Sequence, residues 1–116
     1  MGNIVQEKSF AFALRIVKLS NYLQKEKHET VMSKQLLRCG TSIGANVAES
    51  RYAQSRADFI SKLSIALKES AETSYWLQLL HESSYLNDAE FRSISSNCKE
   101  LEKLLSAIVK TAKNNS

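Results

Sequence analysis

A line of polar side chains at helical spacing is the part of the sequence best placed to do chemistry. Gln35, Arg38, Ser42, Asn46 and Glu49 follow one another at intervals of three or four residues, so a helix would carry them on one face. Amide, guanidinium, hydroxyl and carboxylate groups in one row can pair with each other and with a neighbouring helix. Because buried polar groups must be paired, the favoured interpretation is that this row fixes the register between helices.

Three glutamates are the acidic residues expected near the core. Glu49, Glu69 and Glu72 fall beside apolar positions on predicted helices. Two neighbouring carboxylates can act as a general acid and a general base, which makes acid–base catalysis one alternative. The favoured interpretation is that these acids pair with Arg38 or with lysines, between helices or between subunits.

The other reactive residue types form no recognisable catalytic or metal-binding pattern. His28 and His81 have no Cys, Asp or Glu at the spacing of a metal set. Cys39 and Cys98 fall on apolar faces, which is typical of reduced core thiols rather than of a disulfide. Phosphate loops, dinucleotide fingerprints and nucleophile elbows are missing. We therefore expect a protein that is not an enzyme, with no cofactor, no metal and no small-molecule substrate.

The segment that carries the polar row also has an apolar side with a smooth edge. Ile43 lies on an apolar line, and Gly40, Gly44 and Ala48 recur every four residues beside it. Such small residues allow a second helix to approach closer than the usual 8 to 10 Å. Each glycine inside a helix costs about 1 kcal/mol relative to alanine, so close packing must return that energy. The alternative is a break or kink at Gly40.

The same residues resemble the signature of the 23S ribosomal RNA intervening-sequence protein family. In that family a Gln-x-x-Arg, a Ser-Ile and an Asn-Ile/Val-Ala-Glu lie on the second helix of a four-helix bundle. The matching residues here are Gln35, Arg38, Ser42, Ile43, Asn46, Val47, Ala48 and Glu49. The resemblance continues through Phe59, Leu63, Ile65, Ala66, Glu69, Glu72, Tyr75 and Trp76, and it spans about residues 10–110.

This resemblance implies a fold and an assembly more directly than an activity. It implies an all-α, antiparallel up-down-up-down four-helix bundle. Relatives form pentamers, so a homopentameric ring is expected. The family is also similar in fold to the accessory variability determinant of diversity-generating retroelements, a bundle that binds nucleic acid and a reverse transcriptase. RNA, DNA or another protein are therefore the candidate partners.

Length and composition agree with one helical domain over residues 1–116. The chain has no proline and three glycines, so the residues that punctuate turns and strands are nearly absent. Helices are expected at about 9–25, 30–52, 55–84 and 87–112, with residues 1–8 outside the first one. Neither a signal peptide nor an apolar run of membrane-spanning length is present, so we expect a cytoplasmic protein.

Two helix starts have sequence signatures of their own. Ser55 with Asp58, and Asn87 with Glu90, each place a capping side chain three residues before a carboxylate. In a capping box the two side chains satisfy each other's backbone N–H groups. The third and fourth helices are therefore predicted to begin at these positions.

The first predicted helix is apolar over an arc wider than one partner helix can cover. Phe12 and Ile16 lie on one line, while Phe10, Leu14 and Val17 lie on an adjacent one. This pattern predicts subunit contacts in addition to the intramolecular core. The residues expected to serve helix packing or oligomer contacts are Gln35, Gly40, Ser42, Ile43, Gly44, Asn46, Ala48, Glu49 and the aromatic anchor Trp76.

The positive charge concentrates in the first half of the chain. The net charge is +4, and residues 1–54, 55–86 and 87–116 contribute +4, −1 and +1. We predict nucleic-acid contacts, repeated once per subunit, by Arg15, Lys18, Lys25, Lys34, Arg38 and Arg51. A ring of five subunits would carry about +20 and contact several phosphates at once. The alternative, favoured by the modest charge and by the absence of aromatic residues clustered with the basic ones, is a structural or protein-interaction module.

Overall fold

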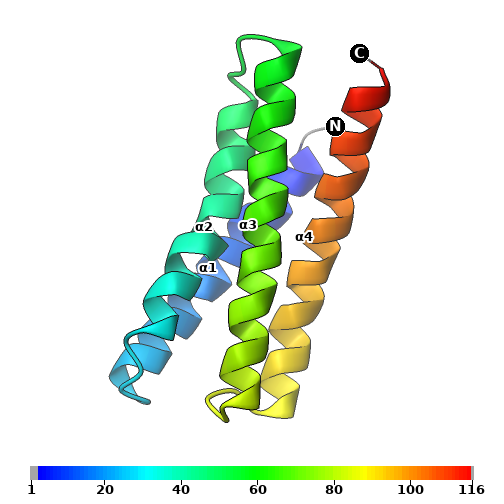
Figure 1. Ribbon diagram of the computed structural model, residues 1–116. Coiled ribbons are helices and arrows are strands. Elements are labelled where there is room, and N and C mark those ends of the chain that lie inside the picture. The colour runs from blue at the N-terminus through cyan, green and yellow to red at the C-terminus, as the bar shows by residue number, and fades with distance from the viewer. Residues whose placement is uncertain (1–2, 116) are drawn as a thin grey trace.

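The computed structural model describes residues 3–115, which form four helices and no strand. The helices are α1 (Asn3–Lys25), α2 (Met32–Ser50), α3 (Arg56–Glu82) and α4 (Asp88–Asn114). Figure 1 shows the chain following α1 to one end of the bundle, returning along α2, and repeating this path with α3 and α4. The predicted all-α fold with four helices is confirmed.

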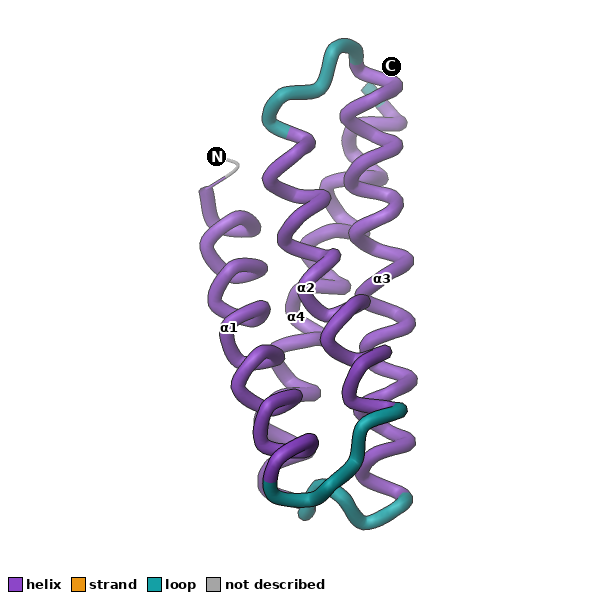
Figure 2. The backbone as a smooth tube through the Cα atoms, turned by 90° about the vertical axis from the view of Figure 1, so that its left-hand side faces the viewer, coloured by secondary structure: helices purple, strands orange, loops and turns teal. Residues whose placement is uncertain are grey.

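The helices pack around one core with unequal contacts. α2 packs extensively on both α1 and α3, α4 packs on α3, and α1 touches α4 only lightly. Within residues 3–115, α1 and α3 share no close approach, so they occupy opposite corners of the bundle. Figure 2 shows the same arrangement from the side on which α1 is at the edge. The bundle measures 46 × 21 × 20 Å.

α1 begins at Asn3 rather than at about residue 9, which corrects the sequence-based boundary. Val5 is buried, and it extends the apolar line of Phe12 and Ile16 toward the N-terminus. The buried hydroxyl of Ser9 donates to the carbonyl of Gln6 at 3.1 Å. The first turns of α1 therefore belong to the core, whereas residues 1 and 2 lie outside the described part of the chain.

α2 begins at Met32, and the buried Glu29 serves its N-terminus. The Glu29 carboxylate accepts from the backbone N–H groups of Val31, Met32 and Ser33 at 3.1, 3.0 and 2.7 Å. The Ser33 hydroxyl donates to the Glu29 carbonyl at 2.7 Å. A carboxylate in this place satisfies N–H groups without intrahelical partners and lies at the positive end of the helix dipole. The short connection before α2 is therefore an ordered cap.

The two predicted capping boxes differ in detail. At the start of α4, Asn87 and Glu90 bond reciprocally at 2.8 and 2.9 Å, which confirms the predicted capping box. At the start of α3, the Ser55 hydroxyl accepts from the Asp58 N–H at 3.0 Å. The Asp58 carboxylate accepts from the N–H of Gln54 instead of Ser55. Half of the predicted box is therefore present at α3, because the Asp58 carboxylate binds the backbone N–H of the residue before Ser55.

The core is apolar and contains small polar groups whose hydrogen bonds are made locally. Ser50, Ser70 and Thr73 are buried, and their hydroxyls donate to backbone carbonyls three or four residues earlier on the same helix. Cys39 and Cys98 are buried and free, as predicted. The Cys98 thiol donates to the carbonyl of Ser70 at 3.4 Å. These bonds allow small polar side chains to fill the core without unpaired groups.

The glycine edge of α2 lies against α1 and holds the two helices together. α2 is continuous through both glycines, and Ile43 beside them is fully buried. A Cβ on Gly40 would lie 2.8 Å from Cγ1 and from Cγ2 of Ile16, and a Cβ on Gly44 would lie 3.2 Å from the carbonyl oxygen of Ser9. Ala48 is exposed, so the edge is closed at the two glycines and open beyond them.

We predict that Gly40→Ala destabilises the protein relative to Gly44→Ala by roughly 1 to 2 kcal/mol. Both substitutions gain about 1 kcal/mol of helix propensity, which makes them a matched pair. At Gly40 the new methyl group meets a branched, fully buried Ile16 side chain, and overpacking of this kind costs about 1 to 3 kcal/mol. Urea unfolding followed by circular dichroism measures the difference. A Gly40→Ala variant more stable than wild type by the full helix-propensity gain of about 1 kcal/mol would contradict the close approach at Gly40.

Candidate functional site

Arg38 projects from α2 between two carboxylates of α3. Its guanidinium Nη1 lies 3.5 Å from Oε1 of Glu69, and its Nη2 pairs with Oε2 of Glu72. The side-chain carbonyl of Gln35 accepts from Nε and Nη2 of Arg38, both at 3.3 Å. Arg38 is half exposed, yet two carboxylates and an amide surround its charge. Its geometry is that of a link between α2 and α3.

Two further residues of the predicted polar row extend this link. The Asn46 side-chain amide donates to the Ser42 carbonyl at 2.9 Å and to the Ser42 hydroxyl at 3.1 Å. The Ser42 hydroxyl donates in turn to Oε2 of Glu69 at 3.4 Å. Glu69 therefore receives contacts from two turns of α2.

Trp76 completes the arrangement on α3. Its indole N–H donates to Oε2 of Glu72 at 3.0 Å, and its ring meets the edge of Tyr75 at 5.1 Å between centroids. The hydrogen bond from Trp76, together with the charge and hydrogen bond of Arg38, holds the pKa of Glu72 below its usual value. Glu72 is thus kept ionised, which suits an acceptor in a fixed network.

We refer to these seven side chains as the α2–α3 network: Gln35, Arg38, Ser42, Asn46, Glu69, Glu72 and Trp76. Glu49, the last member of the predicted polar row, lies apart from it on the exposed side of α2, where it pairs with Lys62 of α3 at 2.9 Å. The carboxylates of the network already have an arginine, a hydroxyl or an indole as partners. This arrangement is suited to fixing the register of α2 against α3 rather than to proton transfer.

Other reactive groups are either buried or engaged. Burial raises the pKa of both thiols, that of Cys98 to about 12. Nε2 of His81 lies 2.7 Å from Oδ1 of Asp88, and its ring stacks on Phe91 at 4.2 Å. Among residues 3–115, no group of three or more His, Cys, Asp and Glu residues is arranged to hold a metal ion. No helix in this range is long and apolar enough to cross a membrane.

The six predicted nucleic-acid residues do not gather on one face. Arg15 turns toward α4, where it donates to Ser93 at 3.1 Å and to Asn97. Lys18 and Lys25 are exposed on α1, and Lys34 is exposed near the start of α2. Arg51 follows the end of α2 and donates to Gln6 at 3.0 Å. Arg38 belongs to the α2–α3 network and differs from the others because carboxylates offset its charge.

A further set of basic residues, on α4, was missed by sequence reasoning. Arg92, Lys99, Lys103 and Lys110 are exposed and follow one another at spacings of seven, four and seven residues. At about 100° per residue this spacing places them on one line, which we call the α4 basic row. The net charge of residues 87–116 is only +1, because the same helix also carries four acidic residues, so the segment charge does not indicate the row. The spacing itself was the signal that could have revealed it.

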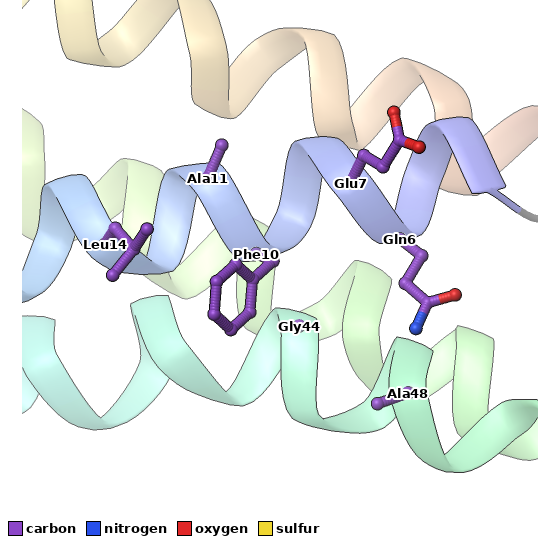
Figure 3. Close-up of a pocket in the computed structure, with 7 residues that line it drawn as sticks. All are labelled: Gln6, Glu7, Phe10, Ala11, Leu14, Gly44 and Ala48. Atoms are coloured by element: carbon purple, nitrogen blue, oxygen red, sulfur yellow. The ribbon is translucent and has the colours of Figure 1, made fainter.

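An apolar surface lies beside the glycine edge. Phe10, Leu14 and Val17, which we call the α1 stripe, are 65%, 50% and 38% exposed. Figure 3 shows Phe10 and Leu14 standing along an open groove whose other wall is formed by Gly44 and Ala48 of α2. The predicted second apolar line of the first helix is therefore uncovered in the single chain.

We predict that Trp76→Phe raises the pKa of Glu72 toward its ordinary value. The indole N–H is the main cause of the lowered pKa, and phenylalanine keeps a ring without this donor. Because the folded-state pKa of Glu72 is lowered, its ionisation stabilises the fold above the unfolded-state pKa, and this stability is lost as pH falls through the folded-state pKa. Carbon-13 NMR titration of the glutamate carboxyl groups measures the shift.

The stability difference between wild type and Trp76→Phe should accordingly be larger at neutral pH than in acid, below the ordinary glutamate pKa of 4.5. Tyr75→Phe is the matched control, since it changes the neighbouring ring and leaves the indole bond in place. An unchanged Glu72 titration in Trp76→Phe would contradict the assigned cause.

Comparisons with known proteins connect this geometry to a family. A profile described as 23S rRNA-intervening sequence protein matches residues 2–107. Among solved structures, a crystal structure of a protein with unknown function from the S23 ribosomal protein family of Bacteroides thetaiotaomicron is 54% identical, with a TM-score of 0.93. The match covers 94% of this chain and 97% of that one. The search of curated proteins finds no match. The chain therefore belongs to the 23S rRNA-intervening sequence protein family.

Proposed function

We propose that the protein is a non-catalytic, cytoplasmic, homo-oligomeric bundle that associates with nucleic acid through basic surfaces repeated on each subunit. The observation that carries this proposal is a set of exposed cations without acidic partners. Lys18, Lys25 and Lys34 form no ion pair within residues 3–115. Arg15 and Arg51 bond only to neutral side chains in the same part of the chain. These charges stay available to phosphate groups.

The absence of catalysis is part of the proposal, and two features support it. The thiols are buried with raised pKa values, so neither is poised as a nucleophile. The carboxylates of the α2–α3 network are held by Arg38, Ser42 and Trp76. A group that already has fixed partners is a poor general base.

Self-association is supported by apolar side chains at opposite corners of the bundle. The α1 stripe is one surface, and the exposed apolar side chains of Ile65, Tyr75 and Leu79, which we call the α3 patch, are spread along one side of α3. A ring of identical subunits needs two different complementary surfaces on each subunit. We propose that the antiparallel up-down-up-down bundle joins its neighbours by placing the α1 stripe of one subunit on the α3 patch of the next. Five is the number of subunits that the family resemblance implies.

One chain has a mass of 13.0 kDa, so a ring of five subunits should have a mass in solution of about 65 kDa. Leu14→Glu should reduce this mass, because a carboxylate in the α1 stripe would lose its water at the interface without gaining a partner. Thr111→Glu, on the exposed side of α4, is the control and should keep the mass. Light scattering coupled to size exclusion measures both. A wild-type mass of one chain would refute the assembly.

We also expect the wild-type protein to bind short RNA and DNA duplexes at low salt and to lose affinity steeply as salt rises. The reason is that contacts between lysine and phosphate release counterions, so each contact adds to the salt dependence. Fluorescence anisotropy across a salt series measures the slope. If no binding occurred even at low salt, the alternative of a structural or protein-interaction module without a nucleic-acid partner would replace this proposal.

A further inference from the structure

We propose that the α4 basic row is the principal nucleic-acid contact of the protein and that it binds the phosphate backbone of a duplex. This inference rests on the proposed function and assigns it to residues outside the six predicted ones. The row consists of Arg92, Lys99, Lys103 and Lys110, as defined above.

The row is straight and faces away from the core. Cys98, Leu101 and Leu105 on the opposite side of α4 are buried, so the four cations extend from the outer side of the helix. From Arg92 to Lys110 the row spans 18 residues, about 27 Å at 1.5 Å per residue. Duplex DNA carries one phosphate per 3.4 Å on each strand. The row is therefore as long as roughly eight base pairs, and because it is straight while the backbone winds, it would meet phosphates on both sides of a groove instead of following one strand.

The charges of the row are offset only in part within the protein. None of the four side chains forms an ion pair in the described part of the chain. Glu100, beside the row, is paired with Lys8 of α1 at 3.0 Å, and Asp88 at the start of α4 is paired with His81. Glu102, next to Lys103, forms no ion pair within residues 3–115, and the pKa of Asp88 is lowered by its hydrogen bond with His81 and, to a smaller degree, by the charge of Arg92. A desolvated phosphate would find four cations that have no competing carboxylate bond.

Arg15 brings a further positive charge to α4, on a different side from the row. It reaches α4 from α1 and bonds to Ser93 and Asn97, which are neutral. At about 100° per residue these two residues lie roughly 100° and 140° around the helix from the row, on the side that faces α1. Among the six predicted residues, Arg15 alone is shown by its hydrogen bonds to reach α4 within residues 3–115.

The side chains around the row favour a duplex over a single strand. No aromatic residue occurs from Arg92 to Lys110, and the ring of Phe91 before it is stacked on His81. Binding of single strands depends on aromatic rings on which bases stack. Exposed hydroxyls of Ser96 and Ser106 lie along the same side of α4, and hydroxyls commonly donate to phosphate oxygens. Cations with hydroxyls and without rings suit a phosphate backbone whose bases remain paired.

The row is separate from the surfaces proposed for self-association. The groove beside the α1 stripe is lined only by α1 and α2 residues, and the α3 patch belongs to a different helix. A subunit contact through these two surfaces leaves the outer side of α4 uncovered. Each subunit of a ring could then present one α4 basic row, so that affinity would grow with the number of rows engaged.

The test compares two triple variants with the same loss of charge. Lys99→Gln, Lys103→Gln and Lys110→Gln are combined in one protein, and Lys18→Gln, Lys25→Gln and Lys34→Gln in the other. Glutamine keeps a long side chain and good helix propensity. Circular dichroism and solution mass check that both variants keep the wild-type fold and assembly. Binding of one duplex RNA, one duplex DNA and one single-stranded RNA is measured by anisotropy across a salt series.

We expect the α4 triple variant to lose affinity for both duplexes and to show a shallower salt dependence. Three lost phosphate contacts reduce the slope of log affinity against log salt by about 3. Between 50 and 200 mM salt, wild-type affinity should therefore fall roughly 40-fold more than that of the α4 variant. The variant with changes on α1 and α2 should lose less affinity and less of its salt dependence than the α4 variant, because its three lysines are secondary contacts, and the single strand should bind less tightly than the duplexes.

The outcomes separate this inference from the proposed function. Absence of wild-type binding to any of the three nucleic acids would overturn both. Wild-type binding that the α4 substitutions leave unchanged would overturn the inference and keep the proposed function. Equal losses in the two triple variants would also overturn it, because net charge rather than the row would then govern binding. Tighter binding to the single strand would overturn the assignment of a duplex.

Discussion

The close approach of α2 to α1 at Gly40 is the contact on which the rest of the bundle depends. Ile16 fills the space that a side chain at Gly40 would take, and at Gly44 a Cβ would lie 3.2 Å from the carbonyl oxygen of Ser9, a less severe contact. Two glycines inside one helix weaken it, so packing must restore their cost. Because α2 is held tightly to α1 on this edge, its opposite edge is free to carry polar residues toward α3. The position of α2 therefore determines where both the α2–α3 network and the α1 stripe lie.

The distribution of partners among the charged residues separates structural charges from available ones. Arg38, Glu69 and Glu72 satisfy each other across two helices, and the resulting network ties α2 to α3. The cations of the α4 basic row and Lys18, Lys25 and Lys34 form no ion pair within residues 3–115. A paired charge adds specificity to packing, whereas an unpaired one contributes to the field outside the protein. Residue type alone does not show whether a charged side chain is paired or unpaired.

Different helices of the bundle expose different kinds of side chain. Apolar side chains are exposed on α1 and on α3, which lie diagonally opposite, and the basic row follows the outer side of α4. Such a division lets one small subunit offer separate places for copies of itself and for a polyanion. In a ring, the modest charge of each subunit would be multiplied without any change in the fold. This arrangement connects the architecture of the family to the function that we propose.

The fold was largely determined by local features of the sequence. Apolar periodicity, the Asn87 and Glu90 capping box and the absence of proline specify four helices, because helix formation and capping depend on residues three or four apart. The glutamates were expected to pair with Arg38 or with lysines, and they do: Glu69 and Glu72 contact Arg38, and Glu49 contacts Lys62. The start of α1 was set too late, since the burial of Val5 depends on its neighbours in space. What only the tertiary structure decided is which polar and charged groups are satisfied. The exposure of Ala48, the neutralisation of Arg38 and the unpaired state of the α4 basic row all depend on which helices meet, and sequence spacing on one helix does not contain that information.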